Sequence, residues 1–131
     1  MTQTAAALYA FFSSFGLPAY VRDSVPDTTD EYGNRRPVDP PYITYELKEP
    51  EPLAPTLLHA WVWFRDTNLI ALSETCDRIK AAIGTGITLP TPSGFVLLFR
   101  DNDTPFAQIQ PDPDETVKAA YLTMIMQANT N

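Results

Sequence analysis

The residues of this chain that could perform acid–base or nucleophilic chemistry are His59, Cys76 and Ser93. His59 is the only histidine, and a lone histidine in a strand is more often a structural or interface residue than a catalytic one. Cys76 falls on the apolar stripe of a helical pattern, where a thiol behaves as a small hydrophobic group. Ser93 belongs to the turn sequence TPSG, and no G-x-S-x-G segment presents it as a nucleophile. We therefore expect a protein that is not an enzyme.

Metal and cofactor sites are not indicated either. Asp101 and Asp103 resemble the first two ligands of a calcium loop, but Pro105 takes the next ligand position and Phe106 the position that needs glycine. A zinc site would need a cluster of Cys and His residues, and the chain has one of each. We expect no metal and no cofactor.

Length and charge predict a single acidic domain. The chain has 131 residues, with 16 Asp and Glu against 9 Lys and Arg, and its only adjacent basic pair is Arg35 and Arg36. This balance disfavours attraction to phosphate backbones. The single cysteine excludes an intrachain disulfide, the N-terminal segment lacks the basic lead of a signal peptide, and no apolar run is long enough to span a membrane. We expect one soluble domain, residues 1–131, made in a reducing cytoplasm.

The segment LLHAWVWFR, residues 57–65, predicts a strand that is apolar on both faces, because side chains alternate across a strand. One face carries Leu58, Ala60, Val62 and Phe64. The other face carries Leu57, Trp61 and Trp63. Such a strand needs a packed layer on each side, and a small domain that cannot supply both takes one from another chain. The sequence therefore predicts a subunit of an assembly.

Two helices and several further strands are predicted around this segment. A first helix is expected to be capped by Thr2 or Thr4 and to stop at Gly16. A second is expected to be capped by Asp66 or Thr67 and to end at the glycine of IKAAIG. Extended segments are expected at residues 19–22, 42–47, 87–89, 95–100 and 106–110.

Two segments have unusual patterns. Residues 27–40, DTTDEYGNRRPVDP, are too polar to bury a core and predict a long protruding loop, of the kind that often binds a partner. Residues 117–129 fit both a helical heptad and a two-sided strand, and the pattern alone does not decide between them.

In chain order, the sequence has a helix ending in FFSSFGLPAY, the extended PYITYEL, the aromatic strand, a helix ending in IKAAIG, a hairpin and a final segment ending in MIMQAN. This order and these strings resemble the tail terminator, or tail completion, proteins of long-tailed phages, which are often labelled minor capsid proteins in prophages. That family is similar in fold to the terminator of phage lambda. The resemblance implies an α+β domain whose antiparallel sheet has two helices on one face, with residues 117–129 as a strand. The long loop between the first and second strands, residues 27–40, departs from the short link that the family has there.

The resemblance also implies a function. The chain is expected to be a structural virion protein that caps the tail tube at the head–tail junction, as a homo-oligomer in a hexameric ring. Its expected partners are the tail tube protein and the stopper or connector proteins of the neck. Genomic DNA would pass through the ring without specific binding, and no membrane is involved.

Candidate residues follow from this expectation. Those for the contact with a neighbouring copy or the tube are Trp61, Trp63, Tyr32, Arg35 and Arg36. Those for an acidic lumen, which would repel phosphate and let DNA slide, are Asp101, Asp103, Asp112, Asp114 and Glu115. The tryptophans also fit ordinary sheet packing, and the carboxylates also fit solvated turns.

Two other functions stay open. Another neck or tail-tube component of the same virion would share the acidity and the two-sided strands. A small-ligand-binding α+β domain would instead need a monomer with a closed pocket and converging polar groups.

Overall fold

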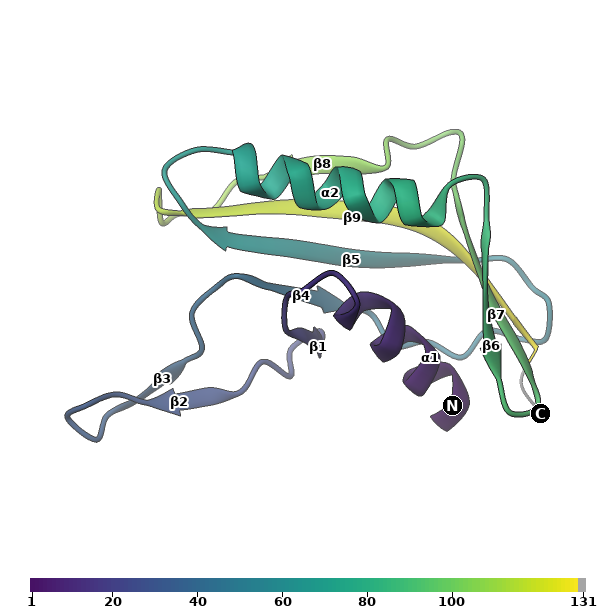
Figure 1. Cartoon of the computed structure of the whole chain (residues 1–131), viewed down its shortest axis with the longest axis horizontal. Helices are drawn as coiled ribbons and strands as arrows, with labels where there is room; N and C mark the ends of the chain where they lie inside the picture. The colour runs from purple at the N-terminus through teal and green to yellow at the C-terminus, as the bar shows by residue number, and fades with distance from the viewer. Residues whose placement is uncertain (130–131) are drawn as a thin grey trace.

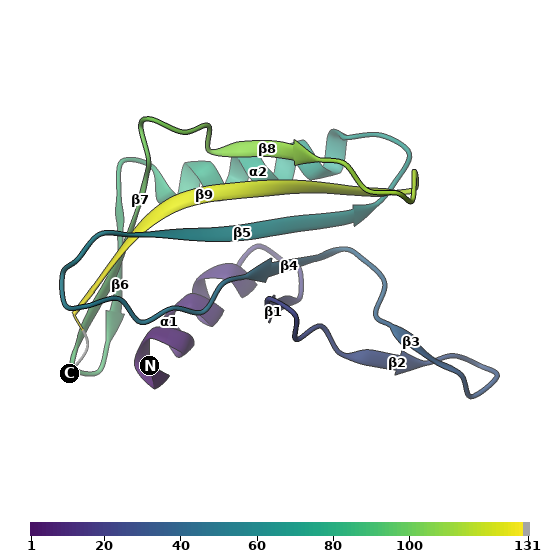
Figure 2. The ribbon, with the colours of Figure 1, turned by 180° about the vertical axis from the view of Figure 1, so that it is seen from behind.

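The computed structural model describes residues 1–129 of the chain. These residues form a curled sheet with two helices against one of its faces, together with a small separate hairpin (Figures 1 and 2). The helices are α1 (Thr2–Ser13) and α2 (Ile70–Ile83). The strands are β1 (Ala19–Val21), β2 (Asp27–Thr29), β3 (Arg35–Pro37), β4 (Tyr42–Tyr45), β5 (Thr56–Arg65), β6 (Ile87–Thr91), β7 (Gly94–Arg100), β8 (Ala107–Gln110) and β9 (Val117–Asn129). The predicted α+β class is confirmed.

The main sheet has the order β1-β4-β5-β9-β7-β6, and β8 also pairs with β9. All of its strand pairs are antiparallel except the pair of β1 with β4. These two strands are parallel because the segment between them carries the chain back to the end of the sheet at which β1 begins. The predicted antiparallel sheet is thus confirmed apart from this one edge. β9 pairs with β5 along one side, and its other side is shared by β8, opposite residues 119–122, and β7, opposite residues 124–129.

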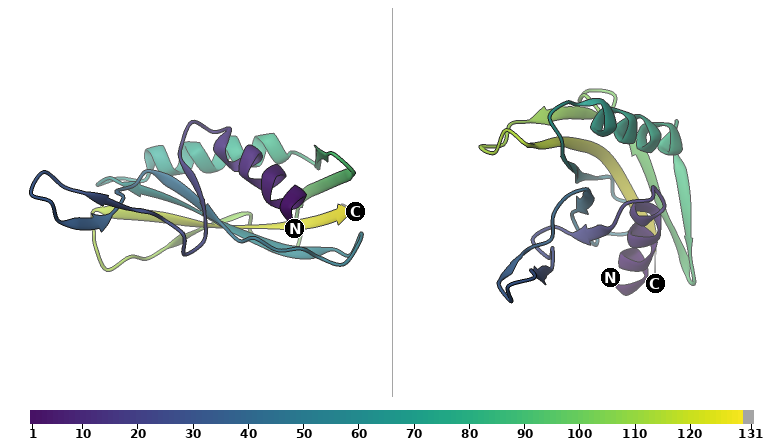
Figure 3. Two further views of the ribbon diagram at one scale, coloured as in Figure 1. Left: turned by 90° about the horizontal axis from the view of Figure 1, so that it is seen from below. Right: turned by 60° about the vertical axis from the view of Figure 1, so that its left-hand side comes forward.

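The core lies between this sheet and the helices, which lie on the same side of it (Figure 3). α1 packs against β1, β4 and β6, and α2 packs against β5, β7 and β9. The fully buried side chains of this layer include Leu8, Phe12, Leu58, Leu72, Ile79 and Leu122. Burying one such side chain stabilises the fold by about 1.5–3 kcal/mol, so this layer holds the sheet in place.

The start of α2 differs from the prediction. The helix begins at Ile70, so neither Asp66 nor Thr67 is its cap. Instead, Asp66 Oδ1 accepts the N–H groups of Thr67 and Asn68 and closes a local turn, and Asn68 Oδ1 accepts the N–H of Ile70 at 3.0 Å. The polar run DTN therefore forms a turn before the helix.

The sequence predicted the C-terminal end of α2 correctly, but not that of α1. Gly84 ends α2 with φ +56°, a conformation that glycine adopts without strain. α1 ends earlier than expected, at Ser13, and Gly16 with φ +81° belongs to the turn that follows. The first residue of α1 is Thr2, its N-cap is Met1, and the Thr4 side chain is buried. Thr2 and Thr4 are therefore not caps.

Residues 27–40 protrude as expected, but they are not an irregular loop. β2 and β3 pair as an antiparallel hairpin, which we call the arm, and it projects away from the sheet (Figure 1). Asp30 Oδ1 accepts the N–H groups of Tyr32 and Asn34, both at 2.9 Å, and Gly33 supplies a positive φ of 80° in the turn. The prediction missed this hairpin because its strands are three residues long and polar.

The ambiguous segment at residues 117–129 is a strand, as the resemblance implied. β9 lies between β5 and the pair β7 and β8, so both of its edges are paired within the sheet. Neighbouring residues that point to opposite faces, such as Ala119 and Ala120 or Leu122 and Thr123, are all buried. A central strand of this kind has the same two-sided apolar composition as a buried helix.

Candidate functional site

The candidate site lies on the open face, which we define as the face of the sheet opposite α1 and α2. Leu57, His59, Trp61 and Trp63 of β5 point to this face, because their neighbours Leu58, Ala60 and Val62 are fully buried on the helix side. Leu57 keeps 45% of its surface exposed, whereas Trp61 keeps 6%. The face is therefore covered unevenly.

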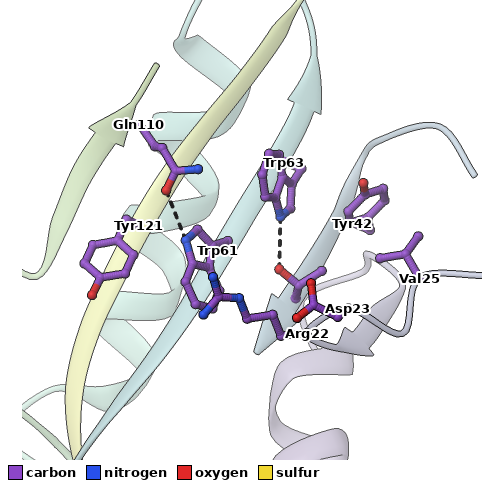
Figure 4. A pocket seen from close by; sticks show the side chains of 9 residues that line it. Arg22, Asp23, Val25, Tyr42, Trp61, Trp63, Gln110 and Tyr121 are labelled. Atoms are coloured by element: carbon purple, nitrogen blue, oxygen red, sulfur yellow. Dashed lines mark hydrogen bonds between the residues drawn. The ribbon is translucent and has the colours of Figure 1, made fainter. Parts of the chain in front are cut away.

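Trp61 is covered by groups from three other strands or their ends (Figure 4). The guanidinium carbon of Arg22, directly after β1, lies 4.3 Å from the centroid of the indole. The indole N–H donates to Gln110 Oε1 of β8 at 3.1 Å, and the Tyr121 ring of β9 lies 5.5 Å away. The structure thus brings this predicted interface residue under side chains of its own chain.

Trp63 is less enclosed. Its indole N–H donates to Thr44 Oγ1 of β4 at 3.0 Å, which satisfies a hydroxyl that is itself buried. The Tyr42 ring lies 6.3 Å from it, and burial, together with the negative charge of Asp39, raises the pKa of Tyr42. Part of the Trp63 surface stays accessible beside these groups.

Together these side chains line an open groove of about 650 Å³ (Figure 4). Its walls are Trp61, Trp63, Tyr42 and Tyr121, and its polar groups come from Arg22, Asp23, Thr44 and Gln110. Asp23 has a positive φ of 64°, which turns the chain sharply at the end of β1. The groove therefore offers flat aromatic surface beside one guanidinium and one carboxylate.

His59 belongs to the same face and is tied to Glu46, which follows β4. Glu46 Oε1 accepts the backbone N–H of His59 at 2.8 Å and lies 2.8 Å from its ring Nδ1. Burial alone raises the pKa of Glu46, but the hydrogen bonds from His59 and the charge of Lys48 outweigh it, so the pKa is lowered. The imidazole also stacks on Tyr121 at 4.9 Å. These contacts fasten β4 to β5 beside the groove.

The arm candidates lie apart from the groove. Tyr32 is 81% exposed near the tip of the arm. Arg35 is 4.0 Å from Asp27, and Arg36 is 3.0 Å from Asp39, in exposed ion pairs of the kind that stabilise little. Arg36 also lines a smaller cleft of about 320 Å³ together with Trp63 and Asp112.

The acidic candidates form two clusters at the two ends of β8. Asp101 and Asp103 lie in the loop before β8, where Asp101 accepts the N–H of Asp103 and the hydroxyl of Thr104. Asp112, Asp114 and Glu115 lie in the loop after it. Asp112 accepts the N–H of Asp114 at 2.9 Å, so these carboxylates also stabilise their own turns.

Asp114 is the best-connected of the acidic candidates. The hydroxyl and the N–H of Thr116 donate to it at 2.7 and 2.9 Å, and together with Arg65 they lower its pKa. Arg65 lies 3.3 Å from Asp114 and 3.3 Å from Asp39 at the base of the arm. This arginine therefore links the turn before β9 to the arm.

Cys76 and Ser93, the other two residues considered for catalysis, contribute to packing and to a hydrogen bond between elements. Cys76 is 7% exposed on the core side of α2, and burial raises its pKa to about 11. The Ser93 hydroxyl donates to Gln3 Oε1 at 2.8 Å, which joins the β6–β7 turn to α1. Within residues 1–129, no three His, Cys, Asp or Glu side chains gather as metal ligands would.

Sequence reasoning missed Arg22, Asp23 and Gln110, which complete the groove. Arg22 reaches Trp61 because β1 pairs with β4 in parallel, and Gln110 reaches it because β8 pairs with the first half of β9. Neither pairing has a local sequence signal. The one available hint is the single arginine directly after the apolar AYV segment.

No protein-family model matches this sequence, and no curated protein matches it at a significant level. Among the described residues, neither helix is long and apolar enough to cross a membrane.

Proposed function

We propose that this chain is a structural protein of a long-tailed phage: a tail terminator, or tail completion, protein that forms a ring on the tail tube. The ring caps the tube and provides the joining interface for the head. The proposal is supported by the resemblance of the sequence and by a fold of the kind that the resemblance implies, with α1 and α2 against one face of a mostly antiparallel sheet.

The observation that carries the proposal is the one-sided cover of the sheet. α1 and α2 pack on the same face, while the open face presents a groove of about 650 Å³ and an exposed Leu57. A face that is only partly covered in a single copy and keeps exposed apolar side chains such as Leu57 is typical of a surface that another chain covers. Copies related by rotation cover such faces in turn and close a ring.

The energetics of such a contact are favourable. A standard interface buries about 800 Å² on each partner, and apolar area contributes about 25 cal/mol per Å². If that area is apolar, the gross gain of roughly 20 kcal/mol can outweigh the estimated 4–15 kcal/mol lost on association, although area does not fix affinity.

Charge and the arm fit the same role. The formal net charge of −7 keeps phosphate from binding, which suits a passage through which DNA moves. We assign the two acidic turns around β8 to the lumen side and the arm, with Tyr32, Arg35 and Arg36, to a neighbouring copy, the tube or the neck. The protein acts at the head–tail junction of the virion, without a cofactor and without catalysis.

The experiment that tests the proposal is native mass spectrometry of the chain, alone and mixed with tail tubes, followed by electron microscopy of the mixture. We expect a six-fold species or a ring on the tube end. Leu57→Ser with Trp63→Ser should remove the ring while the chain stays folded. Tyr9→Ser, at a 55% exposed aromatic residue of α1, is the matched control and should keep it. A chain that stays monomeric even with tubes contradicts the proposal.

A second candidate is a small-ligand-binding domain, because four aromatic rings and several polar groups converge on one groove. Such a domain would be a monomer under all conditions. A further neck or tube component of the same virion differs from a terminator only in its position along the particle, which imaging of intact virions determines.

A further inference from the structure

We propose that the groove of the open face binds the acidic, proline-rich turn of a second copy, residues 49–55 (EPEPLAP). This inference rests on the proposed function, because it specifies one contact between neighbouring copies. It names both halves of that contact on this chain: the groove of Trp61, Trp63, Tyr42, Tyr121 and Arg22, and the turn between β4 and β5.

The groove has the chemistry that recognises proline. Aromatic-lined grooves bind proline-rich segments because the flat rings of both partners pack closely and the segment loses little conformational entropy on binding. Here four aromatic side chains form the walls, and indole and phenol rings offer apolar surface with polar edges. The volume of about 650 Å³ is sufficient for several residues of such a segment.

The turn presents suitable side chains at its surface. Pro52, Leu53 and Pro55 are exposed, with 53% of the Leu53 surface accessible. The Ala54 N–H donates to Glu51 O at 3.0 Å, and the Leu53 N–H donates to Ala128 O at 3.0 Å, so the turn is fixed on the end of β9. These two bonds preform the turn, which lowers the entropy that it would lose on binding.

The backbone of the turn also carries strain. Leu53 has a φ of +61°, a region that disfavours any residue except glycine by about 1–2 kcal/mol. Proline at the preceding position and a positive φ here define a turn in which glycine is the expected residue. Leu53 leaves 53% of its surface exposed in a single copy, so much of its apolar area is not buried there. Burial in a partner's groove would account for it, because burying a leucine yields about 1.5–3 kcal/mol.

The groove carries one cation, Arg22, beside one carboxylate, Asp23, and the cation is complementary to the acidic turn. Arg22 is an exposed cation stacked on Trp61, and a stacked guanidinium keeps its N–H donors at its edge, where they can bind a carboxylate. Glu51 is an exposed carboxylate at the start of the turn. Pairing Glu51 with Arg22 would set the direction in which the segment enters the groove.

The two halves cannot meet within one copy. The turn directly precedes Thr56, at the start of β5, while Trp61 and Trp63 lie near the end of that strand (Figures 1 and 4). Thr56 and Trp63 are seven residues apart, about 23 Å at the usual rise of a strand. The contact therefore joins two copies, and when it is repeated head-to-tail it closes into a ring if the rotation permits.

A charge exchange tests this contact. Arg22→Glu places a carboxylate against Glu51, and Glu51→Arg places a cation against Arg22, so each variant alone should assemble at least about tenfold more weakly than the natural chain. A mixture of the two variants should assemble again, because every groove can then meet a turn of opposite charge. Circular dichroism of each variant first establishes that it is folded.

The outcomes are decisive for the contact. Restored assembly in the mixture supports it, since a folding defect cannot be repaired by a second defective chain. Rings that form equally well from both single variants overturn it while leaving the proposed function intact, and so does a mixture that stays dissociated.

A peptide titration covers the case in which the natural chain does not assemble. The chain has two tryptophans, Trp61 and Trp63, and both line the groove, so intrinsic fluorescence reports on its occupancy. The synthetic peptide KEPEPLAPT should shift the emission in a saturable way, and the same peptide with Glu51→Lys and Leu53→Gly should not. Equal responses to the two peptides, or no response to either, overturn the inference.

Discussion

The two faces of the sheet come from the same strands but are covered in different ways. On the helix face, apolar residues of β5 such as Leu58 and Val62 meet the apolar stripes of α1 and α2. On the open face, Trp61 and Trp63 are met by polar side chains: Arg22, Gln110 and Thr44. The alternating apolar pattern of a strand therefore reveals that both faces need cover, but it does not reveal what supplies it.

This difference has a consequence for binding. The helix face is interlocked and can change only at a large cost, because close-packed cores tolerate little displacement. The open face is covered in part by the long side chain of Arg22 beside an open groove, and such a side chain can shift when a partner arrives. We therefore expect core substitutions to alter folding, and substitutions at exposed positions of the open face, such as Leu57, to alter assembly.

The largest effect that tests this comparison comes from two adjacent leucines. Leu58→Ala removes a fully buried side chain from the helix face and should lower the free energy of unfolding by about 2–5 kcal/mol. Leu57→Ala removes a half-exposed side chain from the open face and should change it by less than about 0.5 kcal/mol. Urea titration of the monomer measures both. Equal losses would mean that the open face is as tightly packed as the core.

The next effect distinguishes the tryptophans within the open face. Trp61→Phe loses the hydrogen bond to Gln110 and much of the cation–π contact with Arg22, so we expect a loss of about 1–3 kcal/mol. Trp63→Phe loses the hydrogen bond to Thr44 and should lower the free energy of unfolding by about 1 kcal/mol. Thermal unfolding at matched concentrations compares them. A larger cost at Trp63 would reverse our assignment of Trp61 as the more enclosed ring.

The same contrast explains which features could be predicted from the sequence. The helix face follows from local periodicity: Leu58, Ala60 and Val62 at alternate positions of β5, and the stripe of Leu72, Cys76, Ile79 and Ile83 on α2. The groove could not be predicted, because Arg22 and Gln110 reach Trp61 only through strand pairings between distant segments.

The arm shows a second limit of sequence analysis. Its composition predicted a protruding segment correctly, but the hairpin depends on the Asp30 side chain, which binds two N–H groups of the turn, and not on apolar alternation. Likewise, β9 and a buried helix share the same apolar composition, so the resemblance and not the pattern identified it as a strand.

A smaller effect concerns pH and the contact that holds β4 beside the open face. The folded chain lowers the pKa of Glu46 from its ordinary value of 4.5, so ionised Glu46 stabilises the fold at neutral pH. That contribution is present above the ordinary pKa and is lost as the pH falls through the lowered one. Glu46→Gln should reduce stability at about pH 7 and weaken its decline in acid. Glu74→Gln, at an exposed position of α2, is the matched control. Parallel stability–pH curves for both variants would contradict this.

The smallest effect is a gain. Leu53→Gly relieves the positive φ of the β4–β5 turn, and the relief is partly offset by the greater freedom of glycine in the unfolded chain, so stability of the monomer should rise by no more than about 1 kcal/mol. Leu53→Ala removes the same exposed side chain but keeps the strained backbone, so it should give no gain. Calorimetry of the two variants separates backbone strain from side-chain contact. If glycine and alanine destabilise the chain equally, the leucine side chain is packed inside its own copy, and the open face loses its proposed ligand.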